Sequence, residues 1–144
     1  MEKFIVYTDG GARENPGPAA IGVVIQDERG GVIKAYGETI GETTNNEAEY
    51  QAVIFALKKL KALFGKAKAS AAEVEVRLDS ELVGKQLRGE YKIQEERLYP
   101  FFIKVWNLRM DFKNVVFVVI PRNKNVQADR LVNQALDRQQ NALF

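Results

Sequence analysis

The sequence predicts an α/β protein built on a five-stranded mixed sheet, in the order βββαβααβα, with helices packed on the faces of the sheet. Three observations predict this class. Two β-rich runs follow a first short apolar run within the opening 40 residues. The rest of the chain alternates helix-like periodicity with strand-like runs. Finally, 46% of the 144 residues are hydrophobic, which suits one domain with a real core, spanning residues 1–144.

The first three strands are predicted to form an antiparallel meander. Residues 3–8, "KFIVYT", read as a short buried strand, and the Gly/Pro-rich stretch "DGGARENPGP" after them reads as a turn region. The runs "AAIGVVIQD" (19–27) and "GVIKAYGETI" (31–40) are rich in β-formers and are separated by "ERGG". Short connections of this kind join antiparallel neighbours.

The second part of the chain is predicted to alternate helices and strands. A long helix is expected over residues 44–64, with a loop at "GKAKASAA" (65–72). The remaining elements are a strand at 73–78, a short helix in "SELVGKQLRG" that a glycine stops, a helix over about 95–111, a strand at 115–120 and a last helix near 126–138.

The composition excludes several chemistries. The chain has no cysteine and no histidine, so disulfides, thiolate nucleophiles, Ser-His-Asp arrangements and imidazole metal ligands are ruled out. A metal held mainly by carboxylates should be a hard ion such as Mg²⁺ or Mn²⁺. The net charge of +2 permits a polyanionic partner without demanding one.

The sequence gives no sign of a membrane or export segment. No apolar run approaches the roughly 18 residues that a membrane span needs, and "MEKFIVYTDGG" lacks a signal-peptide pattern. We therefore expect a cytoplasmic protein without membrane association.

Two glutamates near the start of the long helix are expected to face different ways. With Val53 as zero, Glu49 lies about 40° away on a helical projection, inside the apolar stripe, whereas Glu47 lies about 120° away on the polar side. Glu47 also fits a capping box with Thr44. Glu49 lacks such a structural explanation, although a first-turn acid that reaches solvent remains an alternative.

Three further carboxylates occupy suggestive positions, each with an ordinary alternative. Asp9 ends the first strand, where it could be a turn residue. Asp79 ends the strand at 73–78, where it could cap the next helix. Asp129 lies in the first turn of the last helix, where a carboxylate is favoured by the helix dipole. Because strand ends and helix starts tend to converge on one rim of a sheet, we expect these three and Glu49 to crowd together. Such crowding requires cations, one or two of them.

Four blocks carry a resemblance to a known family: "YTDGGARENPGP", "TTNNEAEYQAV", "RLDSELVGKQLRGEY" and "IPRNKNVQADRLVN". The chain resembles type 1 ribonuclease H over nearly its whole length. The resemblance implies the ribonuclease H-like fold and an endoribonuclease that hydrolyses the RNA strand of RNA–DNA hybrids, leaving 5′-phosphate and 3′-hydroxyl ends. It also implies two Mg²⁺ ions, with Mn²⁺ as a substitute, held by Asp9, Glu49, Asp79 and Asp129.

The same resemblance implies a substrate groove for an RNA–DNA hybrid in a protein that we expect to be a monomer. Its expected residues are Gly10, Gly11, Asn15, Thr44, Asn45, Asn46 and Arg122. The chain departs from many family members in two places. The loop "IPRNKN" carries no histidine and has Arg122 nearest in role, and "EYKIQEERLY" is too short and acidic for a basic protrusion. Lysines in and just after the long helix could compensate, but a solvated helix face is the alternative; they are Lys58, Lys59, Lys61, Lys66 and Lys68.

Two other functions remain open from the sequence. One is a non-catalytic module that binds hybrids or double-stranded RNA on the same fold, which would be expected to lack a carboxylate. The other is a different metal-dependent nuclease of this fold, against which the "NPGP" and "TNNEAEY" blocks argue.

Overall fold

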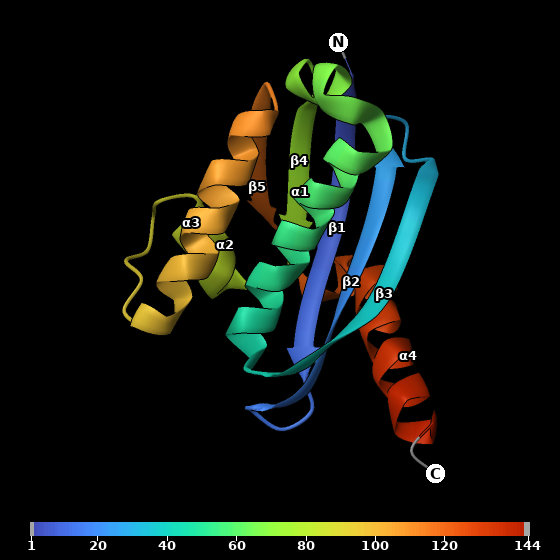
Figure 1. Cartoon of the computed structure of the whole chain (residues 1–144), viewed down its shortest axis with the longest axis vertical. Coiled ribbons are helices and arrows are strands. Elements are labelled where there is room, and N and C mark those ends of the chain that lie inside the picture. Colours follow the sequence, from blue (N-terminus) through green and yellow to red (C-terminus); the bar gives the residue numbers. More distant parts are fainter. Residues whose placement is uncertain (1, 143–144) are drawn as a thin grey trace.

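The computed structural model describes residues 2–142 and contains one five-stranded sheet with the strand order β3-β2-β1-β4-β5 (Figure 1). The strands are β1 (Lys3–Ala12), β2 (Gly17–Asp27), β3 (Val32–Thr43), β4 (Glu73–Leu78) and β5 (Asn114–Val119). The pairs β1–β2 and β2–β3 are antiparallel, and the pairs β1–β4 and β4–β5 are parallel. The predicted mixed sheet and its meander are confirmed.

The first strand runs further than the sequence predicts. It continues through Asp9 and the two glycines to Ala12, because this stretch pairs with β2, where Asp9 lies opposite Gly22. The Asp-Gly turn signal at residue 9 is overruled by this pairing, and the chain reverses only after Ala12. Asp9 is therefore a strand residue and not a turn residue.

The helices also follow the predicted order, with different ends. They are α1 (Asn45–Ser70), α2 (Glu81–Leu87), α3 (Tyr99–Leu108) and α4 (Val126–Ala142). Short 3-10 turns lie at Glu96–Leu98, Arg109–Asp111 and Arg122–Lys124. The expected helix over 95–111 thus divides into α3 and its two flanking turns. The expected loop at 65–72 is mostly helical: Gly65, with a φ of 83°, kinks α1, and the helix resumes to Ser70.

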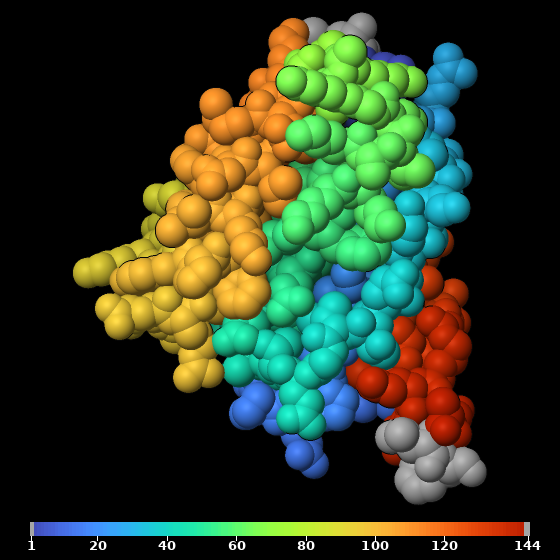
Figure 2. Space-filling model, viewed as in Figure 1, coloured from blue at the N-terminus to red at the C-terminus, as the bar shows by residue number. Residues whose placement is uncertain are grey.

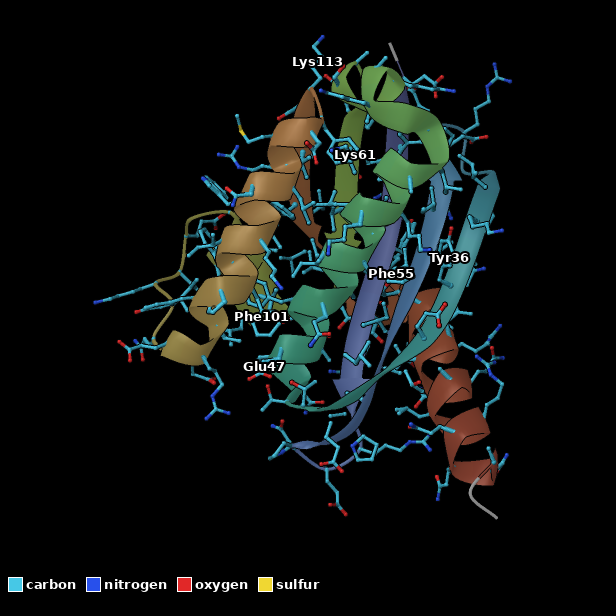
Figure 3. The ribbon with its side chains drawn as sticks, viewed as in Figure 1. Tyr36, Glu47, Phe55, Lys61, Phe101 and Lys113 are labelled. Atoms are coloured by element: carbon cyan, nitrogen blue, oxygen red, sulfur yellow. The ribbon has the colours of Figure 1, made fainter. Side chains whose placement is uncertain are left out.

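Helices cover both faces of the sheet. On the face seen in Figure 2, α1 and α3 lie side by side. Their contact includes Tyr50 and Phe101, whose ring centroids are 6.4 Å apart. Lys61 of α1 also pairs at 3.3 Å with Asp111 in the 3-10 turn that follows α3; Lys61 and Phe101 are labelled in Figure 3. On the other face α4 packs against β1, β2 and β3. The larger core cluster lies under α1, and a smaller one under α4 comprises Ala20, Val132, Ala135 and Leu136.

Some lysines of α1 have structural partners of the kind found on a solvated helix face. Lys59 lies 5.4 Å above the ring of Tyr36, and Lys68 pairs with Glu2 at 2.9 Å. None of the helices within residues 2–142 is long and apolar enough to cross a membrane.

Candidate active site

The site forms where β1 and β4 stop pairing. The two parallel strands remain in register as far as Thr8 and Leu78, and the next residues along each strand are Asp9 and Asp79. Both carboxylates therefore emerge at the same edge of the sheet. Asp79 is not the cap of the helix that follows, because Ser80 takes that role: its Oγ accepts a hydrogen bond from the amide of Val83 at 3.2 Å.

Helix α1 delivers the third carboxylate from one face of the sheet. A Cβ atom built on Gly10 would lie 2.2 Å from the carbonyl oxygen of Ala48, so only glycine lets the helix approach this closely. The approach places Glu49 beside the strand ends. Its side chain is buried, as the helical projection predicted, on the same stripe as the fully buried Val53 and Leu57.

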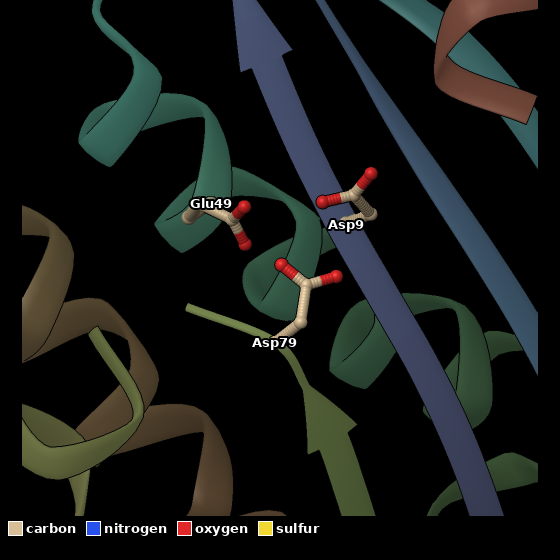
Figure 4. Close-up of side chains that lie close together, drawn as sticks. All are labelled: Asp9, Glu49 and Asp79. Carbon is tan, nitrogen blue, oxygen red and sulfur yellow. The ribbon is translucent and has the colours of Figure 1, made fainter. Parts of the chain in front are cut away.

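The structure brings Asp9, Glu49 and Asp79 together (Figure 4). One carboxylate oxygen from each lies within 4.8 Å of the others. Asp9 and Glu49 are buried, whereas Asp79 is partly exposed and opens the cluster toward solvent.

Burial and mutual repulsion both disfavour negative charge here. Desolvation, followed by the neighbouring charge of Asp79, raises the pKa of Asp9 from 3.8 to about 7. Desolvation, followed by the charge of Asp9, raises the pKa of Glu49 well above its ordinary value. Without a cation, Asp9 and Glu49 therefore keep their protons to a higher pH than isolated carboxyl groups do.

The donor set fits a hard divalent cation. All the donors are carboxylate oxygens, and Oε2 of Glu49 is buried without a hydrogen-bond partner among the described residues. An ionised carboxylate oxygen in that position needs positive charge or a donor nearby. Oxygen-only clusters of this kind suit Mg²⁺ or Mn²⁺.

Asp129 lines the same cleft from the opposite face of the sheet. The cleft has a volume of about 530 Å³ and is also lined by the three clustered carboxylates. Asp129 lies in the first turn of α4 and is exposed, outside the 4.8 Å cluster, yet close enough that its charge contributes to the raised pKa of Asp9. A Cβ on Gly22 would lie 2.1 Å from the carbonyl oxygen of Ala128, so a second glycine permits this approach of helix to strand.

The residues expected at the substrate groove divide into two sets. Gly10, Gly11, Asn45, Asn46 and Arg122 line the cleft with the carboxylates. Asn15 and Thr44 are not among its lining residues and make structural bonds next to it.

Those structural bonds shape the cleft wall. The Asn15 side-chain oxygen accepts from the amide of Asn45 at 2.9 Å, and the Asn45 side-chain oxygen accepts from the amide of Ala12 at 2.8 Å. Together these bonds tie the β1–β2 connection to the start of α1.

The start of α1 forms one of the two hydrogen bonds of the predicted capping box. The Thr44 hydroxyl accepts from the amide of Glu47 at 3.2 Å, as expected of an N-cap. The Glu47 carboxylate, however, accepts from the hydroxyl of Thr43 and lies 4.0 Å from Arg97. In place of the reciprocal bond from the Thr44 backbone amide, the Glu47 carboxylate thus accepts a bond from the side chain of Thr43.

Asn125 is a site residue that the sequence reasoning did not select. Its side-chain amide contacts Asp79, and the residue itself is almost completely buried. The available signal was its position before α4, four residues ahead of Asp129, where an asparagine reads most simply as a helix-start residue.

A mixed five-stranded sheet with carboxylates gathered where its central strands β1 and β4 stop pairing defines a protein of the ribonuclease H-like class. A family model described as reverse transcriptase-like matches residues 7–135. The ribonuclease HI of Halobacterium salinarum is 41% identical over 131 residues, which make up 91% of this chain and 63% of that protein. The chain spans 36% of a longer bifunctional protein of Mycobacterium tuberculosis.

Solved structures agree with these matches. LC11-RNase H1 in complex with an RNA/DNA hybrid is 52% identical, with a TM-score of 0.90 and 95% and 99% of the two chains covered. The RNase H1 of Halobacterium salinarum NRC-1 is 40% identical, with a TM-score of 0.86 and coverage of 94% and 98%. The chain belongs to the type 1 ribonuclease H family.

Proposed function

We propose that this protein is an endoribonuclease that hydrolyses the RNA strand of RNA–DNA hybrids in a reaction that requires divalent cations. The observation that carries the proposal is the convergence of Asp9, Glu49 and Asp79 within 4.8 Å, in a cleft that Asn45 and Asn46 also line. The likeness to LC11-RNase H1, which was solved with an RNA/DNA hybrid, supports the choice of substrate.

The four carboxylates would hold two Mg²⁺ ions, or Mn²⁺ in their place. When bound, such a pair activates water and neutralises charge at a phosphodiester, which is the chemistry that leaves 5′-phosphate and 3′-hydroxyl ends. The chain contributes the ligands and their geometry: Asp9 and Asp79 from the point where β1 and β4 stop pairing, and Glu49 from a helix packed against β1. Asp129 would complete the set from α4.

Amide side chains in the cleft would recognise RNA. The bond from the amide of Ala12 to Oδ1 fixes the Asn45 side chain, and no described residue engages its Nδ2 group. That group can donate a hydrogen bond to a 2′-hydroxyl, which distinguishes RNA from DNA. Asn46 and the backbone of Gly10 and Gly11 line the same wall. The exposed Arg122 would contact a phosphate of the hybrid.

A cleavage assay with an end-labelled hybrid tests the proposal. We expect cuts at internal positions of the RNA strand with Mg²⁺. Activity should persist when Mn²⁺ replaces Mg²⁺ and should be absent in excess chelator. An all-DNA duplex of the same sequence is the matched control and should stay intact. Equal cutting of that duplex would refute the substrate, and cutting in chelator would refute the role of the cation.

We further propose that residues 1–144 act as one domain and as a monomer in the cytoplasm. Sedimentation at several protein concentrations tests the monomer, and a concentration-dependent mass would contradict it.

A further inference from the structure

Asn125 lies at the junction of the elements that carry the candidate carboxylates. It follows the 3-10 turn at Arg122–Lys124 and directly precedes α4. Its side chain is only 1% exposed. Its Nδ2 atom donates to the carbonyl oxygen of Thr8 at 2.9 Å and to Oδ2 of Asp79 at 2.8 Å. One buried amide group therefore joins Thr8, where β1 stops pairing with β4, to the residue after β4.

The chemistry of the partners fixes the orientation of this amide. A carbonyl oxygen and a carboxylate oxygen both accept hydrogen bonds, so only the NH₂ group of the asparagine can face them. Its two N–H groups match the two acceptors one to one. A carboxylate at position 125 would repel both partners, and an apolar side chain would remove this donor from both.

The same residue also connects to Asp129. The backbone carbonyl of Asn125 accepts from the amide of Asp129 at 3.1 Å, which begins the hydrogen-bonding pattern of α4. Thr8 is the residue immediately before Asp9. Asn125 thus contacts Asp79 directly and is bonded to Asp129 and to the neighbour of Asp9.

We infer that Asn125 is a positioning residue that holds the Asp79 carboxylate in the orientation required to bind a divalent cation. The inference deepens the proposed function and rests on it for the identity of the site. Asn125 uses both N–H groups on protein acceptors and is not among the residues that line the cleft. Its effect therefore passes through Asp79, in the manner of the outer residues that orient metal ligands.

The unpaired oxygen of Asn125 supports this role over a purely structural one. Oδ1 is buried without a partner among the described residues, which disfavours an asparagine here as far as folding alone is concerned. The benefit that offsets this penalty lies on the Nδ2 side, where the amide contacts Asp79.

Asn125→Ala, with Asn123→Ala as the matched control, tests the inference. Asn123 is an exposed asparagine in the adjacent 3-10 turn and has no assigned role in the site. Mg²⁺ and Mn²⁺ affinity is measured by calorimetry on the protein alone, and hybrid affinity is measured separately in Ca²⁺. For Asn125→Ala we expect affinity for Mg²⁺ and Mn²⁺ to fall about tenfold or more with hybrid affinity unchanged. Asn123→Ala should match the wild type.

Stability and cation binding are separated by a second measurement. If Asn125→Ala is partly unfolded, the rise in its urea midpoint with Mg²⁺ concentration still reports the affinity of the folded fraction. Asn125→Ser, which keeps one donor, should lie between the wild type and Asn125→Ala. A variant that loses stability but binds Mg²⁺ as the wild type does would overturn the inference. A wild type that binds Mg²⁺ but cuts no hybrid would refute the proposed function, while the affinity comparison would still decide the role of Asn125.

Discussion

Gly10 of β1 and Ala48 of α1 meet backbone to backbone, and this contact sets the distance between two candidate metal ligands. Asp9 precedes the glycine and Glu49 follows the alanine. A Cβ on Gly10 would lie 2.2 Å from the Ala48 carbonyl oxygen and 2.5 Å from the Glu49 amide nitrogen. Both obstacles are backbone atoms, so no side-chain rotation can relieve the clash. Any substitution must push α1 away from the sheet.

Gly10→Ala should therefore lower both stability and cation affinity. We expect a loss of unfolding free energy of about 1–3 kcal/mol, the usual range for overpacking, and a marked loss of hybrid cleavage. Urea denaturation and calorimetry with Mg²⁺ measure the two effects. Gly11→Ala serves as the stability control, because its Cβ would make an ordinary 3.7 Å contact with Val132. Equal stability losses in the two variants would argue against the close approach.

Replacing Asp79 separates cation binding from folding. Asp79→Asn should abolish turnover while leaving the fold and hybrid binding largely intact, because the helix cap belongs to Ser80 and not to Asp79. Removal of one of three crowded charges should also stabilise the metal-free protein. Circular dichroism, thermal unfolding in chelator and single-turnover cleavage provide the measurements. A variant that retains near wild-type turnover would contradict the assignment.

The metal-free protein should lose stability as the pH rises from about 4 to about 7. The pKa of Asp9 is about 7 in the folded state against 3.8 ordinarily, so over this interval the folded state binds more protons than the unfolded state. The free energy of unfolding then falls with pH, and the Asp9 contribution levels off above about pH 7. Saturating Mg²⁺ should weaken the slope, because a cation replaces the protons.

Urea unfolding in chelator at several pH values measures this slope. Asp9→Asn provides the comparison, since it removes one of the two buried carboxyl groups with a raised pKa and should reduce the slope. A wild-type slope that is zero or of opposite sign, or one that Asp9→Asn leaves unchanged, would contradict the prediction.

Arg122 offers a test of substrate contact apart from chemistry. The residue is exposed on the cleft wall, and the loop that carries it contains no histidine. Arg122→Ala should weaken hybrid affinity and reduce its salt dependence while changing the single-turnover rate little at saturating enzyme. A collapse of the saturated rate would assign Arg122 to the chemical step.

The sequence predicted the parts of this site that depend on local periodicity and strand order. The inward position of Glu49 followed from the helical stripe that contains Val53 and Leu57. The extension of β1 past Asp9 did not follow, because only pairing with β2 outweighs the Asp-Gly turn signal. Asn125 was missed for a related reason: its two acceptors lie 117 and 46 residues away along the chain.

Glu47 and Glu49 lie two residues apart in the first turns of one helix, and their environments separate their expected roles. Glu49 is 8% exposed and belongs to the carboxylate cluster. Glu47 lies at the start of α1, where it accepts a bond from Thr43 (Figure 3). Each Glu→Gln change removes one charge with little change in shape, so the two variants control for each other.

Glu49→Gln should reduce hybrid cleavage by orders of magnitude, because a neutral amide is a poorer ligand for Mg²⁺ than a carboxylate. Glu47→Gln should remain active, since its amide oxygen can still accept from the Thr43 hydroxyl, and its stability should change by under about 1 kcal/mol. Cleavage rates across a range of Mg²⁺ concentrations, together with urea unfolding of both variants, measure these effects. Comparable activity losses in the two variants, or a larger loss for Glu47→Gln, would mean that the helix start rather than the inward carboxylate controls the reaction.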